Sequence, residues 1–169
     1  MATAEERLME WLRDAHAMEE QAETMLGSLA QRIKNYPEVK AQVQRHLEET
    51  RRQAETLREC IERRGGDTSS VKDLTGKLVA MGQGLSGLVV GDEIVKGTMA
   101  CYTFEHMEIA SYSVLIAAAD AVGDFETRAA CERSLREEEA MADWLKQHLA
   151  TVTGSYVGRE EAPGVVAKH

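Results

Sequence analysis

Apolar residues recur along the first segment of the chain in alternating steps of four and three, the spacing of one face of an α-helix. This pattern predicts a helix over residues 4–34, whose apolar stripe contains a single charged residue, Glu19. Asn35-Tyr36-Pro37 ends the segment, because proline cannot continue a helix and suits the first turn of the next one. The positions of the stripe are Leu8, Leu12, Ala15, Glu19, Ala22, Leu26, Leu29 and Ile33.

Three more segments show the same helical period. Residues 38–64 form the second predicted helix, which ends at Gly65-Gly66-Asp67 in the way that helix C-termini commonly end. Residues 92–121 form the third, followed by a turn at residues 122–124, and residues 125–151 form the fourth. The stripe of the second helix is Val43, Leu47, Thr50, Ala54, Leu57 and Ile61, and that of the fourth is Cys131, Leu135, Glu138, Ala142, Leu145 and Leu149.

The connection between the second and third helices is long and rich in glycine. We expect residues 68–91 to cross over along the length of the molecule, with a short extra helix capped by Ser69 or Ser70 inside the crossover. Two helical hairpins joined by one long crossover are the ferritin-like plan. The sequence therefore predicts an all-α, ferritin-like antiparallel four-helix bundle over residues 1–152. Residues 153–169 show no helical period and are predicted to form a partly ordered C-terminal tail.

Composition and charge narrow the function classes. Two prolines and 5% aromatic residues among 169 are typical of a single all-helical domain. The net charge of −9 argues against nucleic acid as a partner, since phosphate binding needs concentrated lysine and arginine. No stretch approaches the about 18 apolar residues of a membrane span, and the N-terminus lacks the apolar core of a signal peptide. We therefore expect a cytoplasmic protein without membrane partners. Its three scattered cysteines support neither a zinc site nor a disulfide framework.

Polar residues interrupt the apolar stripe near the middle of every predicted helix. The third helix carries two acids, Glu105 and Glu108, which share a helix face because they are three residues apart. Since the helices run antiparallel, side chains from the middle of each helix meet at about the same height in the bundle. The residues concerned are Glu19 in the first helix, His46, Glu49 and Thr50 in the second, Glu105 and Glu108 in the third, and Glu138 in the fourth.

The free-energy cost of burying charged carboxylates must be offset by protonation or by a nearby positive charge. One unpaired buried carboxylate costs several kcal/mol, and neighbouring carboxylates repel strongly at the low dielectric of a core. Few counter-ions lie at matching positions, since Arg13, Arg32, Arg45 and Arg52 fall mostly on outer faces. Either some of the acids are protonated or a multivalent cation lies among them, and a pair of divalent metal ions explains the pattern better. Carboxylates with few imidazoles and no thiolate favour Fe, Mn or Mg over Cu or structural Zn.

The histidines depart from the usual order for such a site. Di-iron and di-manganese carboxylate bundles take a Glu-x-x-His motif from each of two helices, and this chain contains no such motif. It has the reverse order, in His16-x-x-Glu19 and His46-x-x-Glu49, where a histidine beside an acid is more commonly a hydrogen-bonded residue than a ligand. We favour His46 over His16 as a site member. His106 lies about 100° around the helix from the preceding acid, which favours a hydrogen bond to the site over ligation.

Four stretches of the chain, one in each predicted helix, resemble the YciE/YciF family of bacterial ferritin-like stress proteins. They are LRDAHAMEEQAETML (12–26), HLEETRRQAETL (46–57), FEHMEIASY (104–112) and SLREEEAMADWL (134–145). The resemblance implies a ferritin-like bundle that is usually a dimer, with a di-metal centre and an association with bacterial stress responses. His16 departs from the aromatic residue expected at its position. The acidic positions that the resemblance implies for the centre are Glu19, Glu49, Glu105, Glu108 and Glu138.

These observations predict a di-iron or di-manganese protein that acts in stress defence through redox chemistry with peroxide or O₂. Its predicted partners are metal ions and a second copy of the chain. The alternative is a metal-free structural or interaction bundle, favoured by the missing Glu-x-x-His motif and by the apolar, glycine-rich residues 76–97, which suit a dimer interface. The native metal, the substrate, the occurrence of catalysis, and the choice of Glu105 or Glu108 as the bridge stay open at this point. The predicted metal ligands are Glu19, Glu49, Glu105, Glu108, Glu138 and His46.

Overall fold

The chain folds into long helices. A computed structural model describes residues 1–68, 93–162, 164 and 166 of the 169. The described residues form four α-helices and no β-strand, which confirms the predicted all-α class. Among these residues, none of the helices combines the length and apolar character that crossing a bilayer requires. The helices are α1 (Ala4–Arg32), α2 (Pro37–Arg63), α4 (Glu93–Ala121) and α5 (Phe125–Glu160).

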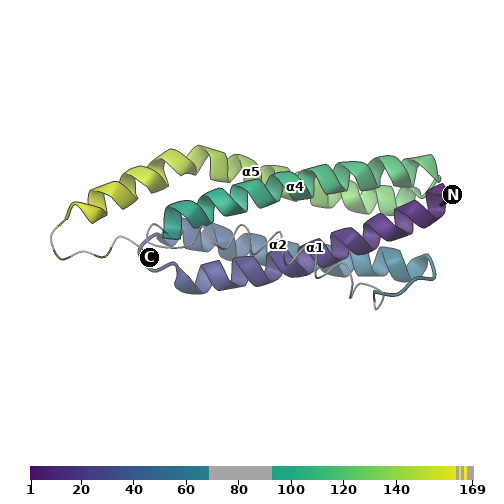
Figure 1. Ribbon diagram of the computed structural model, residues 1–169, viewed down its shortest axis with the longest axis horizontal. Helices are drawn as coiled ribbons and strands as arrows, with labels where there is room; N and C mark the ends of the chain where they lie inside the picture. The colour runs from purple at the N-terminus through teal and green to yellow at the C-terminus, as the bar shows by residue number, and fades with distance from the viewer. Residues whose placement is uncertain (69–92, 163, 165, 167–169) are drawn as a thin grey trace.

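The helices form two antiparallel pairs along the long axis of the molecule (Figure 1). α1 packs against α2, α4 packs against α5, and α1 also packs against α4, whereas α2 and α5 pack against each other less closely than these three pairs. The end of α2 and the start of α4 lie at opposite ends of the bundle, so these two helices run parallel (Figure 1). This is the predicted ferritin-like arrangement of two hairpins, which requires one long connection. The predicted extra helix of that connection falls in residues 69–92, outside the described residues.

Local sequence signals set the ends of the helices. Thr3 and Glu6 form a capping box, in which each side chain accepts a hydrogen bond from the backbone N–H of the other residue. Pro37 occupies the first position of α2, as its fixed φ predicts. Gly65 and Gly123 have φ angles of 76° and 74°, which allow the chain to turn away after α2 and α4. The turns predicted at both glycines are confirmed.

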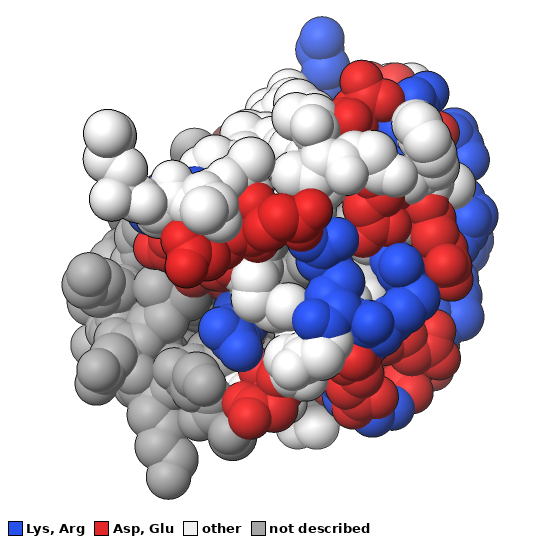
Figure 2. Space-filling view, turned by 90° about the vertical axis from the view of Figure 1, so that its right-hand side faces the viewer, with Lys and Arg blue, Asp and Glu red and all other residues white. Residues whose placement is uncertain are grey.

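Charged side chains of both signs tie the helices together at the end of the bundle that carries the N-terminus (Figure 2). Asp124 caps α5 by accepting a hydrogen bond from the backbone N–H of Thr127. The same carboxylate lies 2.9 Å from the guanidinium of Arg63 and 2.5 Å from that of Arg64. Arg64 also forms an ion pair with Glu5 of α1. This end of the molecule therefore joins α1, α2 and α5 through one network of ion pairs.

Two hydrophobic clusters fill the two halves of the bundle. One includes Leu12 and Leu115, both 0% exposed, and the other includes Leu26 and Leu145. All the positions of the stripe predicted for α1 are buried, including Glu19. Burial of one leucine side chain contributes about 2 kcal/mol, so these clusters account for much of the driving force for folding. On α5, Glu138 lies between residues of the two clusters, whereas Glu19 of α1 and Glu108 of α4 lie among residues of the cluster that includes Leu12.

Helix α5 is longer than the sequence pattern predicted, and the predicted end of the fourth helix at Thr151 is wrong. The helix continues to Glu160, through residues assigned to the tail. Val152 is 4% exposed and packs in the same cluster as Leu145, with Tyr156 beside it. The two glycines of this stretch hid the helical period, since each costs a helix about 1 kcal/mol. Burial of an apolar face outweighs that cost.

Candidate metal centre

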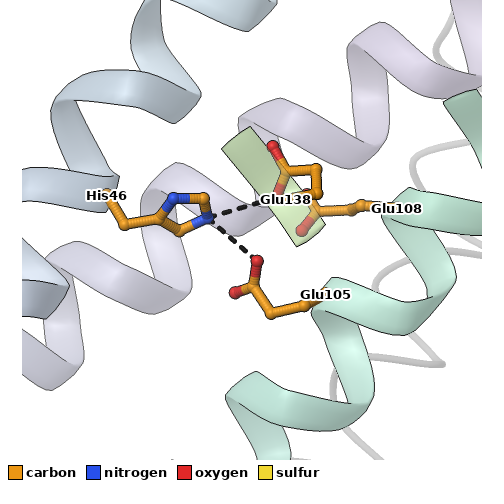
Figure 3. A group of neighbouring side chains, drawn as sticks. All are labelled: His46, Glu105, Glu108 and Glu138. Carbon is orange, nitrogen blue, oxygen red and sulfur yellow. Dashed lines mark ion pairs between the residues drawn. The ribbon is translucent and has the colours of Figure 1, made fainter. Parts of the chain in front are cut away.

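Four buried side chains from three helices converge near the middle of the bundle (Figure 3). His46 comes from α2, Glu105 and Glu108 come from α4, and Glu138 comes from α5. One ligand atom from each residue lies within 4.8 Å of those of the others. Each residue is at most 1% exposed. The three-residue spacing of Glu105 and Glu108 places both on one face of α4, as the sequence predicts. We call these four residues the central cluster.

His46 contacts three carboxylates from both sides of its ring. Its Nε2 atom lies 3.0 Å from Glu105 and 3.2 Å from Glu138, and its Nδ1 atom lies 3.0 Å from Glu49. Burial by itself would lower the pKa of this imidazole, but the contacts with the three carboxylates outweigh burial and raise the pKa. With no metal ion bound, His46 is therefore protonated and supplies positive charge to the core.

The single positive charge of His46 does not balance the negative charges that all the surrounding carboxyl groups would carry if ionised. Burial raises the pKa of Glu105 to about 8, although contact with His46 acts in the opposite direction. Burial, followed by repulsion from Glu19 and Glu138, raises the pKa of Glu108 well above its ordinary value. Both carboxyl groups consequently favour the protonated form at neutral pH unless a further cation lies next to them.

Several polar atoms of the central cluster have no hydrogen-bond partner among the described residues, although each is shielded from solvent. The contacts of His46 Nε2 are short enough for ion pairs but lack hydrogen-bond geometry. Buried polar atoms in proteins almost always have partners, so these atoms point to a common partner at the centre of the group. The atoms are His46 Nε2, Glu105 Oε2, Glu108 Oε1 and both carboxylate oxygens of Glu138.

The spacing and the chemistry of these atoms fit a divalent cation. In a six-coordinate site with bonds of about 2.1 Å, neighbouring ligand atoms lie about 3.0 Å apart and opposite ones about 4.2 Å apart. The contacts of His46 Nε2, at 3.0 and 3.2 Å, match the first spacing, and the whole group spans no more than 4.8 Å. Three carboxylates, which are hard donors, together with one imidazole, a borderline donor, suit Fe, Mn or Mg better than Cu or structural Zn. The central cluster has the donors and dimensions to hold such an ion.

Glu19 of α1 lies next to the central cluster but outside the group of mutually close ligand atoms. It is 0% exposed, and the Tyr112 hydroxyl donates a 2.5 Å hydrogen bond to its Oε1 atom. The other oxygen, Oε2, has no partner among the described residues. Burial and repulsion from Glu138 raise the pKa of Glu19 well above its ordinary value. Sequence reasoning missed the hydrogen bond, since its two residues are 93 positions apart.

Glu49 lies on the far side of the imidazole from the central cluster. Its side chain is 22% exposed, and its carboxylate is 3.0 Å from His46 Nδ1. The contact with His46 lowers the pKa of Glu49, so this carboxylate is ionised at neutral pH. The structure therefore gathers His46, Glu105, Glu108 and Glu138 at the centre, while Glu19 and Glu49 lie beside this group.

Two further histidines considered in the sequence lie away from the central cluster. His16 is 6% exposed, and its Nδ1 atom is 3.8 Å from the Glu20 carboxylate. His106 is exposed, and its ring lies edge-on against Tyr102 with ring centroids 4.6 Å apart. The hydrogen bond expected from His106 to the site is not formed with any described residue, because the side chain points to the outside of α4.

Two buried glutamines of α2 reach across to α5, and the sequence reasoning missed both. Gln42 donates a hydrogen bond to the sulfur of Met141 at 3.4 Å, and Gln53 donates one to Glu137 at 2.8 Å. Gln42 precedes His46 by four positions and Gln53 follows it by seven, so all three share one helix face. That spacing was the signal in the sequence that could have found them.

The fold and the site together define a ferritin-like four-helix bundle with a buried cluster of carboxylates and one histidine. A family model described as "Domain of unknown function (DUF892)" matches residues 3–158. Because the match covers most of its length, the chain belongs to this family.

The chain is similar to several solved structures. A protein from Xanthomonas campestris is 36% identical, with a TM-score of 0.81 over 95% of this chain and 100% of that one. YcfI from Rhodopseudomonas palustris is 25% identical, with a TM-score of 0.68 over 86% and 94%. The E. coli stress protein YciF is 22% identical and has the same fold, with a TM-score of 0.72 over 89% and 97%. With the family match, these neighbours confirm the resemblance to the YciE/YciF family.

Proposed function

We propose that this protein binds a pair of iron or manganese ions and uses them in redox reactions with peroxide or O₂ during bacterial stress. One observation carries the proposal: buried carboxylate oxygens and His46 Nε2, all without hydrogen-bond partners among the described residues, converge on one position in the core. Membership of a family that includes ferritin-like stress proteins supports a role in bacterial stress. The proposed metal ligands are Glu19, Glu49, Glu105, Glu108, Glu138 and His46.

The number of acids favours two ions over one. Glu19 presents an unpartnered buried oxygen beside the central cluster, and repulsion between Glu19, Glu108 and Glu138 contributes to the raised pKa of Glu19 and of Glu108. An ion held by the central cluster leaves this side of the site negatively charged. A second ion between these three carboxylates would relieve the repulsion, as in carboxylate-bridged bundles.

The contact between Glu49 and His46 suits a metal-binding imidazole. A ring that binds a metal through Nε2 carries its proton on Nδ1, and a carboxylate that accepts this proton fixes the orientation of the ring. Glu49 is 3.0 Å from Nδ1, so it can fill this role or turn towards an ion as a terminal ligand. Metal binding would displace protons from His46 Nε2, Glu105 and Glu108, and metal affinity should therefore fall as the pH falls.

Bound iron or manganese would supply one-electron redox chemistry, which none of the side chains in the central cluster provides. The residues of the chain would position the ions and keep water from them, since hydrophobic clusters close the core on both sides of the site. The Tyr112 hydroxyl would hold Glu19 Oε1 and leave Oε2 to face an ion.

Metal content tests the proposal directly. We would measure it by mass spectrometry on protein purified without chelator or nickel affinity, for the wild type, Glu138→Gln and Glu139→Gln. Glu139 is exposed and adjacent to Glu138, so its variant is a matched control. The wild type and the control should carry about two Fe or Mn ions per chain, and Glu138→Gln should lose them. Sub-stoichiometric metal that neither the substitution nor added Fe(II) or Mn(II) changes would refute the proposal.

Peroxide consumption by the metal-loaded protein tests the redox step separately. Glu105→Gln removes a charge from the central cluster, whereas Glu132→Gln removes one from a partly exposed surface position on α5. We expect the first variant to consume peroxide much more slowly than wild type and the second to match it. Equal rates in all three proteins would contradict a role for the cluster in the reaction.

A metal-free structural or interaction bundle is the second candidate. It is supported by the position of His46, whose protonated ring contacts three carboxylates and so provides compensation from within the protein. The two candidates differ in their response to chelator. A metal-free bundle melts at the same temperature with and without EDTA, while a metal protein melts at a lower temperature after chelation.

We propose a homodimer in the bacterial cytoplasm as the working form of the protein. The support is the resemblance to a family whose members are usually dimers. Sedimentation equilibrium tests the assembly: a mass of twice the 18.7 kDa chain is expected. A large closed shell would instead favour iron storage.

A further inference from the structure

A groove opens along the seam between α2 and α5, the two neighbouring helices that approach each other least. Its volume is about 390 Å³, a size that suits a small molecule rather than a protein segment. Its lining includes Arg45 from α2 and Arg133 and Arg136 from α5, which we call the groove arginines. The groove also reaches Met141 and Glu49, whose carboxylate contacts His46 Nδ1.

The groove arginines have unusual surroundings for this protein. The chain has 29 acidic and 20 basic residues, and most of its described arginines form an ion pair with an aspartate or a glutamate. Arg45 and Arg136 form no ion pair or hydrogen bond with a described residue, and Arg133 donates only to the backbone oxygen of Ala129. Five described arginines form no ion pair with a described acid, and three of them line this groove, whereas Arg13 and Arg159 lie elsewhere and donate to backbone oxygens.

The two acids of the groove do not fully neutralise its three arginines, because each acid also contacts a group outside the groove arginines. Glu49 contacts His46 Nδ1 at 3.0 Å. Glu137 accepts a hydrogen bond from Gln53 at 2.8 Å and lies 3.6 Å from the guanidinium of Arg52. Glu49 also attracts Arg45, but three arginines outnumber two carboxylates in the lining, so the groove keeps a net positive charge for a ligand.

From this geometry we propose that the α2–α5 groove binds a small anion with a carboxylate or phosphate group. Guanidinium groups form paired hydrogen bonds with the oxygens of these groups, and several around one concave site give both charge and orientation. The same charge repels free Fe²⁺ or Mn²⁺, so metal ions do not enter by this route unless an anion carries them. That the bound anion lies beside a working metal centre rests on the function proposed above; the anion site itself does not.

Calorimetric titration of the metal-free, full-length protein with citrate, and separately with inorganic phosphate, tests the site. The test variant is Arg133→Gln/Arg136→Gln. The matched control is Arg7→Gln/Arg58→Gln, which removes the same charge from one exposed and one partly exposed residue, both of them ion-paired. Wild type and control should bind one probe saturably, and the test variant should bind it at least about tenfold more weakly. The probe that saturates identifies the group as carboxylate or phosphate.

Two results would overturn the proposal. One is the absence of saturable binding of either probe to wild type, and the other is equal weakening in the test variant and the control, which would reveal a response to net charge alone. Melting curves show whether the variants fold, and Arg45→Gln supplies a single substitution from the opposite helix with the same expected loss. Because the titration uses metal-free protein, failure of the metal proposal would leave its outcome unchanged.

Discussion

Replacing Tyr112 by phenylalanine tests how the acidic core is held together. The substitution removes only the hydroxyl that donates to Glu19 Oε1 at 2.5 Å and leaves the ring in place. Tyr112 and Glu19 are both 0% exposed, so water does not replace the lost donor. Leaving a buried acceptor unpaired costs about 1–3 kcal/mol. In a chain of 169 residues, each kcal/mol lowers Tm by about 2–4 °C, which gives an expected decrease of roughly 2–12 °C.

Differential scanning calorimetry of the metal-free protein measures this decrease. Tyr156→Phe is the matched control, because its hydroxyl donates to the exposed Glu160 at 3.1 Å, and a surface change of this kind shifts stability by no more than about 0.5 kcal/mol. The hydrogen bond from Tyr112 also lowers the pKa of Glu19, so its loss should weaken metal binding in the loaded protein. If Tyr112→Phe melts at the temperature of the control, the bond does not stabilise the core and the reasoning fails.

Three further predictions concern pH, metal and the length of α5. Burial alone would raise the pKa of Asp124, but hydrogen bonds and the ion pairs with Arg63 and Arg64 outweigh it and hold the pKa below its ordinary value. The stability that ionised Asp124 contributes is present above the unfolded-state pKa of about 3.9 and is lost as the pH falls through the folded-state pKa. The free energy of unfolding in urea should therefore decrease less on acidification for Asp124→Asn than for wild type. Chelation should lower the Tm of the metal-loaded protein, since metal at 100 times Kd contributes about 2.7 kcal/mol, and an unchanged Tm in calorimetry would count against bound metal. Val152→Ala should cost roughly 1–2 kcal/mol in urea unfolding, while Val157→Ala, at a position 45% exposed, should cost little; equal losses would contradict the packing of the end of α5.

The charge balance of the central cluster should differ between the metal-free and the metal-bound protein. Without metal, the raised pKa values of Glu105 and Glu108 favour neutral carboxyl groups, and protonated His46 balances part of the remaining charge. With metal, the same groups lose their protons to become ligands. A mechanism of this kind predicts proton release on metal binding, which titration calorimetry in buffers of different ionisation enthalpy detects.

The sequence by itself determined the helices and the residues that depart from their apolar faces. A helical stripe is a local property, since residues three and four apart share a face whatever the tertiary structure. The stripe of α1 was therefore correct at every position, and the turns at Gly65 and Gly123 followed from their sequence. A charged residue in such a stripe is also a local signal, which is why the helical period alone singles out Glu19 and Glu138.

Only the tertiary structure decided which of these side chains meet. Distances between residues on different helices depend on the rotation and register of each helix in the bundle, which spacing along one chain does not contain. Packing brought His46 against Glu105 and Glu138, and it joined Tyr112 to Glu19 across 93 positions. Packing likewise extended α5 to Glu160, because the hydrophobic cluster around Leu145 buries Val152 despite the glycines nearby. The groove between α2 and α5 has the same origin, since it exists only where two helices separated in sequence stand apart.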